Sequence, residues 1–424
     1  MQKFMLLLTV LLVCGQAYGG GFQIALQGQQ QIGMAHAGTS VPLNAAALYY
    51  NPGAMGFLQG RKISFGVNPA FAKINFLQAS TRLSSSNTFE LVTPFSLYYT
   101  QRLGKAEHNT QTTGFTFGVG VYTPFGSKLS YPNDWVGKFL VQNVGLTTIF
   151  TQPTIGYNIN ERIGIGLGLV FGWGNFAIQR AIPIYGQTGY GTAKLSASGV
   201  GFGFTTGLYV EPWEDKLSVG LSYKSAARVN LNGKADFTVP QGAEILFPDS
   251  NFDMNVGLPD LFSAGVTYYF NGTKEGILSD KSNASFISLD VERAGWNIFK
   301  ELKFEYADTI AGATELKLTR NYQNTYRFSI GGQYVAGPKL SFRAGIYYDL
   351  AAAPDCCVTP DVPDTDRLVG TAGATLHISP KLQVDLSLLY GQGFERTTVN
   401  EENNFEGTYT AKVIIPGIGL QYSF

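Results

Sequence analysis

The sequence contains few side chains that could catalyse a reaction. The sequence has three histidines, and one of them, His377, is followed two positions later by the hydroxyl side chain of Ser379. A Ser–His pair needs a third residue that orients the imidazole, and no Asn follows closely. A metal site needs a cluster of ligands, which the sequence lacks. Cys356 and Cys357 are adjacent, which leaves a vicinal disulfide and two free thiols as alternatives. We therefore expect no enzyme, no metal and no cofactor.

Charged side chains in the second half could instead bind an anionic ligand. Arg327 and Arg343 lie on neighbouring predicted strands and fall on the polar face of these strands, as do Asp290, Glu292 and Asp385. Either arginine could orient a carboxylate head group through charge-assisted hydrogen bonds. The alternative is an internal salt-bridge network between these arginines and acids that stabilises the fold.

The C-terminal strand indicates which fold positions these residues. Its apolar residues Pro416, Ile418, Leu420, Tyr422 and Phe424 alternate with small or polar ones up to the chain end. Successive side chains of a strand point to opposite faces, so one face of this strand is apolar. A terminal strand of this kind that stops on Phe is typical of outer-membrane β-barrels. Segments of about ten alternating residues recur from residue 61 onward, which is the pattern of such barrels.

Composition agrees with a membrane barrel. Charged residues make up only 14% of the 424 residues, and the 51 Gly, 23 Tyr and 30 Phe suit many strands with aromatic girdles. The formal net charge is zero, so no nucleic acid partner is expected. Residues 1–19 have the basic start, apolar centre and small-residue end of a secretory signal peptide.

We predict an all-β fold, a transmembrane antiparallel barrel of about 14 strands formed by residues 61–424. The strands are expected at 61–76, 87–103, 113–123, 144–158, 161–180, 194–211, 215–231, 257–271, 284–296, 324–336, 339–350, 367–378, 381–394 and 408–424. Short connections alternate with long ones at 124–143, 181–193, 232–256, 297–323, 351–366 and 395–407. This alternation is typical of periplasmic turns and extracellular loops.

Residues 20–60 contain no Asp, Glu, Lys or Arg. A free periplasmic tail is normally charged, whereas this moderately apolar segment favours burial. We predict an N-terminal hatch that fills the barrel lumen, with an extra periplasmic hairpin as the alternative. Farther along, the loop 122–143 carries the large apolar residues Trp135, Phe139 and Leu140. They could form an outer capture groove for lipid or fold over the barrel mouth.

Taken together, the residues resemble the FadL/TodX-type outer-membrane transporters of long-chain fatty acids and hydrocarbons. The blocks that carry the resemblance are Gly21-Phe22, Ile32-Gly33-Met34-Ala35, Ala37-Gly38, Asn51-Pro52, Tyr122-Thr123-Pro124-Phe125-Gly126, Trp135-Val136-Gly137-Lys138-Phe139, Pro153, Tyr157, Gly257-Leu258-Pro259-Asp260, Arg343-Ala344-Gly345-Ile346-Tyr347-Tyr348-Asp349 and Pro363-Asp364-Thr365-Asp366-Arg367.

The resemblance implies a 14-strand barrel closed by a hatch, with a kinked third strand that opens the wall sideways. It makes Phe22 and the motif Asn51-Pro52-Gly53 hatch residues, although the family's motif ends in Ala where this chain has Gly53. Gly adds backbone freedom there, which puts the rigidity of the hatch in question. Gly118, Gly120 and Pro124 become the candidate lateral gate.

We therefore expect passive transport of hydrophobic compounds across the outer membrane, through a lumen site and a lateral opening. The alternatives are a general porin and a structural barrel. The expected partners are a hydrophobic small molecule, outer-membrane lipid and, through Phe424, the barrel-assembly machinery. The protein is expected to be a monomer.

Overall fold

The computed structural model describes residues 20–103, 113–184, 189–270 and 281–424. The predicted signal peptide, residues 1–19, and most of the turns at 104–112 and 272–283 lie outside the described residues. No helix within the described ranges is long and apolar enough to cross a membrane.

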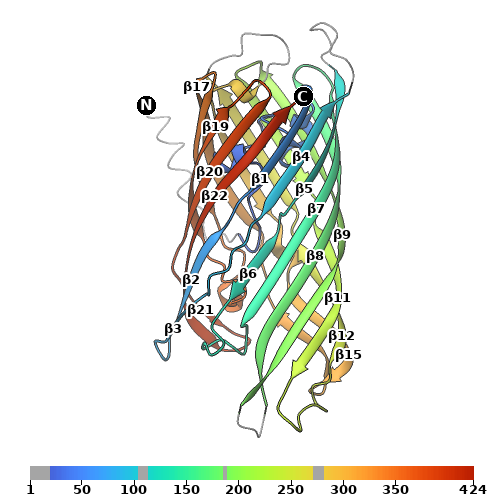
Figure 1. Cartoon of the computed structure of the whole chain (residues 1–424), viewed down its shortest axis with the longest axis vertical. Coiled ribbons are helices and arrows are strands. Elements are labelled where there is room, and N and C mark those ends of the chain that lie inside the picture. Colours follow the sequence, from blue (N-terminus) through green and yellow to red (C-terminus); the bar gives the residue numbers. More distant parts are fainter. Residues whose placement is uncertain (1–19, 104–112, 185–188, 271–280) are drawn as a thin grey trace.

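The strands form a closed antiparallel barrel of 14 wall strands (Figure 1), which confirms the predicted fold class. The first seven wall strands are β1 (Arg61–Val67) with β2 (Phe71–Gln78), β4 (Phe95–Arg102), β5 (Gly114–Tyr122) with β6 (Gly126–Ser130), β7 (Asn143–Asn158), β8 (Ile163–Pro183), β9 (Tyr190–Trp213), and β10 (Leu217–Lys224) with β11 (Ala227–Thr238). The others are β12 (Ser250–Leu258) with β13 (Leu261–Tyr269), β14 (Phe286–Ala294), β17 (Thr325–Gly337), β18 (Leu340–Asp349), β19 (Arg367–His377), β20 (Leu382–Gly393) and β22 (Phe405–Ser423).

Alternating side chains explain why these segments pair as a barrel in a membrane. On β8, Ile165, Leu167, Leu169, Phe171 and Trp173 are exposed on the outer surface, while the glycines between them face inward. Outward apolar residues meet hydrocarbon, and barrel closure satisfies the backbone hydrogen-bonding groups. The barrel closes where β1 pairs with β22, from Lys62 opposite Ser423 to Val67 opposite Ile418.

Long connections lie at the end of the barrel opposite the C-terminus, which Figure 1 shows at the bottom. Here the prediction of a plain loop at 297–323 is wrong, because β15 (Glu301–Ile310) and β16 (Ala313–Thr319) form a hairpin. β15 also pairs with β12, opposite Phe252 to Met254. The barrel pattern of the sequence does not reveal the hairpin, because its outer face carries charges such as Lys303 and Glu315 instead of apolar residues.

Other short elements complete this end. β11 continues to Thr238 and β12 begins at Ser250, so the predicted loop 232–256 is shorter than expected. The remaining short elements at this end are β3 (Ser84–Ser86), β21 (Arg396–Asn400), η3 (Trp296–Ile298) and η4 (Asp355–Cys357). η2 (Lys281–Asn283) lies at the other end, where Lys281 contacts Asp215 in the turn between β9 and β10. A disulfide joins Cys356 to Cys357 in η4.

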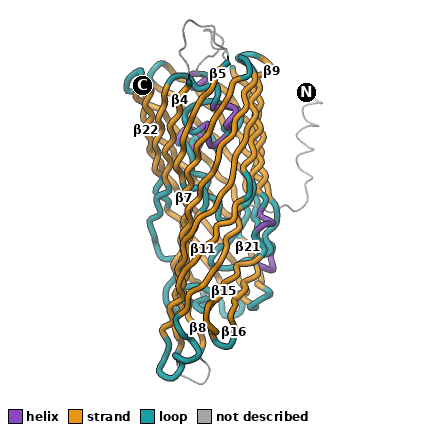
Figure 2. Tube along the Cα trace, turned by 90° about the vertical axis from the view of Figure 1, so that its right-hand side faces the viewer, coloured by secondary structure: helices purple, strands orange, loops and turns teal. Residues whose placement is uncertain are grey.

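Residues 20–60 lie inside the barrel, where Figure 2 shows their short helices within the strand wall. The helices are α2 (Gln29–Ile32), α3 (Ala47–Tyr50) and α4 (Pro52–Met55). Asn51 caps α4 by accepting a hydrogen bond from the Gly53 amide, and its amide group donates to the carbonyls of Thr39 and Leu208 at 2.8 and 2.9 Å. This one side chain therefore joins two parts of the segment to the wall.

Close backbone packing explains the glycine at position 53. A Cβ atom on Gly53 would lie 2.7 Å from the carbonyl oxygen of Gly164 and 2.8 Å from that of Gly207. The segment thus rests directly on the inner surface of β8 and β9, at a point where neither partner carries a side chain.

Candidate functional site

The third wall strand is interrupted at residues 123–125, between β5 and β6. β5 pairs with both β4 and β7, but β6 pairs only with β7 among the described strands. Gly118 and Gly120 lie within β5 and are paired on both sides, so the break lies beyond them, around Pro124. Both glycines instead leave room for Leu48, which lies close to each of them.

The start of the lumen segment lies against this break. The Gly126 amide donates to the Phe22 carbonyl at 3.0 Å, and the Ile24 amide donates to the Pro124 carbonyl at 2.8 Å. Phe22 packs edge-on against Phe125, and also against the rings of Trp296 and Phe299. Residues 22–24 therefore supply backbone partners at the point where the wall strand is broken.

A cavity of about 520 Å³ reaches the wall at the same place. Its lining includes residues 21–26 of the lumen segment, and residues 91–94 and 126–128 on the two sides of the break. Ala70, Val369 and Ile415 are among the apolar residues that line the rest of it. At the far end of the break, the segment before β4 contacts β6 again, because Glu90 forms an ion pair with Lys128 at 2.6 Å. The site is thus an apolar chamber beside a short stretch of the wall where β6 has no strand partner on the β4 side.

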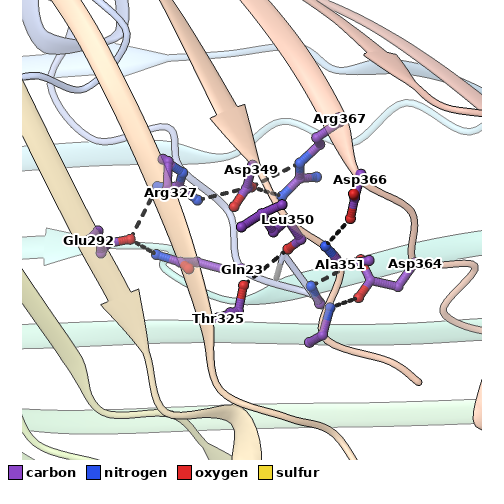
Figure 3. Close-up of polar contacts among 12 residues, drawn as sticks. Gln23, Glu292, Thr325, Arg327, Asp349, Leu350, Ala351, Asp364, Asp366 and Arg367 are labelled. Atoms are coloured by element: carbon purple, nitrogen blue, oxygen red, sulfur yellow. Dashed lines mark hydrogen bonds and ion pairs between the residues drawn. The ribbon is translucent and has the colours of Figure 1, made fainter. Parts of the chain in front are cut away.

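Arg327 belongs to an ion-pair network beside this chamber (Figure 3). Its guanidinium contacts Glu292 at 3.2 Å and Asp349 at 3.3 Å, and Arg367 contacts the same Asp349 carboxylate. The amide of Gln23 donates to Glu292 at 2.9 Å, which links the lumen segment to the network. Arg327 therefore already has two carboxylate partners.

Arg343 and the other predicted acids take part in different contacts. Arg343 donates to Thr375 at 2.6 Å, and Thr375 donates to Asp385. Asp290 accepts a hydrogen bond from the Thr39 amide at 2.9 Å, and Asp385 accepts one from Gln30 at 3.2 Å. Both acids thus hold the lumen segment. The structure does not bring Arg343 and Arg327 together at one point.

Lys224 is an inward-facing cation that the sequence analysis missed. Its ammonium lies 4.4 Å from the ring centroid of Tyr49 in the lumen segment. It lines two small cavities, one shared with Glu292 and the other with Pro124 and Phe125. None of the ion pairs among the described residues involves Lys224. The alternation of β10 could have identified it, since Lys224 continues the polar face of Ser218, Gly220 and Ser222.

The loop that carries Trp135, Phe139 and Leu140 folds into the barrel mouth. Trp135 is only 4% exposed, stacks on Tyr131 with ring centroids 4.1 Å apart, and donates its indole N–H to the Val141 carbonyl at 2.6 Å. Phe139 is 42% exposed and Leu140 is partly buried. Of the three predicted capture residues, Phe139 alone presents a large apolar surface to the outside.

A second cavity, of about 180 Å³, lies at the extracellular end below the β15–β16 hairpin. Ile178, Phe247 and Phe304 are among its apolar lining residues, and Arg180 and Glu315 are its charged ones. Part of this lining comes from the hairpin, which is why the sequence analysis did not predict the cavity. No group of three or more His, Cys, Asp or Glu side chains in the described part of the chain is placed to bind a metal ion.

Comparisons with known proteins agree with this architecture. The sequence model of a family described as "Outer membrane protein transport protein (OMPP1/FadL/TodX)" matches residues 10–424. The chain is 25% identical to the 47 kDa outer membrane protein of Pasteurella multocida, covering 97% of this chain and 96% of that protein. It is 22% identical to the long-chain fatty acid transport protein of Escherichia coli O6:H1, covering 100% and 98%.

Solved structures give the same fold. The crystal structure of a FadL homologue from Pseudomonas aeruginosa superimposes with a TM-score of 0.80 at 18% identity, covering 96% of this chain and 100% of that one. The P. putida toluene transporter TodX gives a TM-score of 0.71 at 16% identity, covering 94% and 98%.

Proposed function

The chain belongs to the OMPP1/FadL/TodX family of outer-membrane transport proteins, and on that premise we propose a lateral route for its hydrophobic ligands. The protein is an outer-membrane β-barrel that transports hydrophobic compounds, and both its family and its fold are those of transport channels rather than enzymes. In the proposed route the ligand leaves the lumen through the break in the third wall strand and enters the membrane.

The observation that carries this proposal is the apolar cavity that meets the wall at residues 91–94 and 126–128. Apolar burial contributes about 0.8 kcal/mol per CH₂ group, so such a chamber can hold an acyl chain or a hydrocarbon without specific contacts. A ligand that leaves sideways stays out of water. The cavity below the β15–β16 hairpin supports an entry step at the outer surface.

Residues 20–60 act as the hatch in this proposal. They occupy the lumen, and Asn51, Pro52 and Gly53 pack against β8 and β9. A direct aqueous path to the periplasm would make the protein a porin. The filled lumen favours lateral release instead, and Phe22 becomes the hatch residue nearest the break.

For an anionic ligand, we place the head-group contact at Lys224. Arg327 and Arg343 were the expected residues, but each is already held by polar partners. Lys224 stands next to Tyr49, Pro124 and Phe125, beside the break. The names of the relatives include both a fatty acid transporter and a toluene transporter. An ammonium at this point would favour the fatty acid class.

The test is to fill the gap from its two sides with Thr93→Trp and Ser127→Trp, alone and together. Uptake of a radiolabelled long-chain fatty acid by cells that lack their own transporter should fall, while the purified variant still binds the acid. Ser196→Trp, on the outer face of β9 near the long-loop end, is the matched control. Unchanged uptake in the double variant would exclude the lateral route.

A further inference from the structure

Two lysines face each other on the outer surface of the barrel, and neither forms an ion pair with any residue that the structure describes. Lys73 of β2 is directly opposite Lys412 of β22 in the antiparallel register, and both side chains are exposed. β2 and β22 run side by side in Figure 1. Like charges on directly opposite residues of neighbouring strands repel each other.

The carboxylates on adjacent segments do not neutralise this pair. Glu395 and Glu406 form no ion pair with either lysine within the ranges that the structure describes. Lys128, on the far side of the wall break, provides a contrast because Glu90 contacts it at 2.6 Å. The two opposed ammonium groups therefore favour an external anion.

The position of the pair relative to the membrane indicates the source of that anion. On three adjacent strands the outer face changes from apolar to polar at the same level. Tyr390, Ile414 and Phe71 are in register on the membrane side, and Gln392, Lys412 and Lys73 are in register one step toward the long-loop end. Beyond them the next cross-strand pair is polar, with Asn75 donating to Thr410. This level marks the boundary between hydrocarbon and head groups on the extracellular side.

Apolar surface lies next to the lysines on their membrane side. Phe71 is 43% exposed and stacks on Phe89, which is 65% exposed, with ring centroids 5.8 Å apart. A lipid whose phosphate contacts the two ammonium groups can lay its acyl chains against these rings. A free phosphate ion would gain nothing from them.

We propose that Lys73 and Lys412 form a binding site for the phosphate group of a lipid in the outer leaflet. The phosphate oxygens accept charge-assisted hydrogen bonds from both ammonium groups, which removes the repulsion between them. The site lies on β2 and β22, which are not the strands paired with β5 or β6 at the wall break, although Lys412 is also among the residues that line the chamber.

Native mass spectrometry of the full chain in detergent, titrated with diphosphorylated lipid A or with its dephosphorylated form, tests the proposal. The unmodified protein should bind the phosphorylated lipid at least about tenfold more tightly, as expected from hydrogen bonds to charged groups. The double variant K73Q/K412Q should lose this preference, and K73R/K412R should keep it. The control K194Q/K234Q removes two outward lysines from β9 and β11 and should also keep it.

Three results would overturn the site. The first is an unchanged preference in K73Q/K412Q, or an equal loss in K194Q/K234Q. The second is a loss of preference in K73R/K412R, which would show that positive charge is not the cause. The third is displacement of the lipid by millimolar inorganic phosphate, which would show that the lysines bind free phosphate rather than a lipid.

Discussion

Inward-facing cations of the barrel have two different kinds of environment. Arg327 is enclosed by Glu292 and Asp349, so its charge is compensated within the protein. Lys224 contacts the face of Tyr49, and the described residues offer it no ion pair. Breaking a compensated pair leaves a buried charge alone, at a cost of about 3–5 kcal/mol. A cation without a direct ion-pair contact can instead be satisfied by a ligand.

These environments predict opposite effects of two matched substitutions. Arg327→Gln should lower the stability of the barrel and leave the preference for a fatty acid over a neutral hydrocarbon of equal length unchanged. Lys224→Gln should keep or raise stability and weaken fatty acid binding by about 1.5–3 kcal/mol, the size of a charge-assisted bond. Thermal unfolding and binding titrations of both ligands measure the two effects. Equal loss of affinity for both ligands in Lys224→Gln would refute the head-group role.

His36 predicts a pH dependence of the lumen segment. The ring is buried against Tyr50, with Nδ1 3.1 Å from the hydroxyl, and burial lowers the pKa of His36 to about 3. Because the unfolded ring has a pKa near 6.5, it binds a proton before the folded one does. The resulting contribution to stability is fully present above pH 6.5 and is lost as the pH falls toward 3.

The matching variant is His36→Gln. Its melting temperature should fall less between pH 7 and pH 5 than that of the unmodified protein, since only the latter has a histidine to protonate in the unfolded state. Carboxylates that titrate in the same range are common to both proteins and drop out of the comparison. Parallel pH profiles would show that His36 is not buried as a neutral ring.

At the scale of elements, the wall break and residues 22–24 form one unit. The backbone of the lumen segment replaces the neighbour that β6 lacks, and Phe22 holds it there against three aromatic rings. Truncating a buried Phe costs about 3–5 kcal/mol. Loss of that packing should release residues 22–24 from the wall while the barrel stays intact.

Phe22→Ala should therefore increase hydrogen exchange at Ile24 and Gly126 by about two orders of magnitude. Hydrogen–deuterium exchange with mass spectrometry of peptides that cover 20–27 and 122–130 measures this directly. Phe89→Ala removes an equally large ring from the outer surface and should leave both peptides unchanged. Equal protection in Phe22→Ala and the unmodified protein would contradict the coupling.

The surroundings of each strand explain which elements the sequence predicts. Strands in contact with lipid, such as β8, show an apolar outer face and were located within a few residues. β15 and β16 stand in water beyond the membrane, so their outer faces are charged and the membrane pattern does not detect them. The wall break was located only approximately, because Gly118 and Gly120 mark close contact with Leu48 rather than the break itself.

For the site residues, too, the sequence predicts some properties and not others. Whether a cation faces inward follows from alternation, and Arg327, Arg343 and Lys224 all obey that rule. Whether it is already paired depends on strand register, since Glu292 and Asp349 reach Arg327 from two different neighbouring strands. Register across a barrel is a tertiary property that local patterns do not contain.

For the whole molecule, the proposed route depends on how firmly the lumen segment is held in the barrel. A barrel of this size encloses space that the segment fills, with Asn51 bonded to both Thr39 and the wall carbonyl of Leu208. Gly53 lies too close to Gly164 and Gly207 for a side chain. The lumen segment is thus held by polar bonds and by close backbone contact.

Removing the hatch should therefore convert the protein into an open pore. In planar bilayers the full mature chain should give little steady conductance, and a variant that lacks residues 20–60 should give a large one, because water and ions then fill the lumen. Gly53→Ala should give an intermediate result, with brief openings, since the added methyl group pushes α4 away from β8 and β9. Gly337→Ala, where an added Cβ meets no atom within 4 Å, is the control and should behave like the unmodified protein. If the full chain already conducts as strongly as the deletion variant, the segment does not block the lumen, and the protein is a general porin.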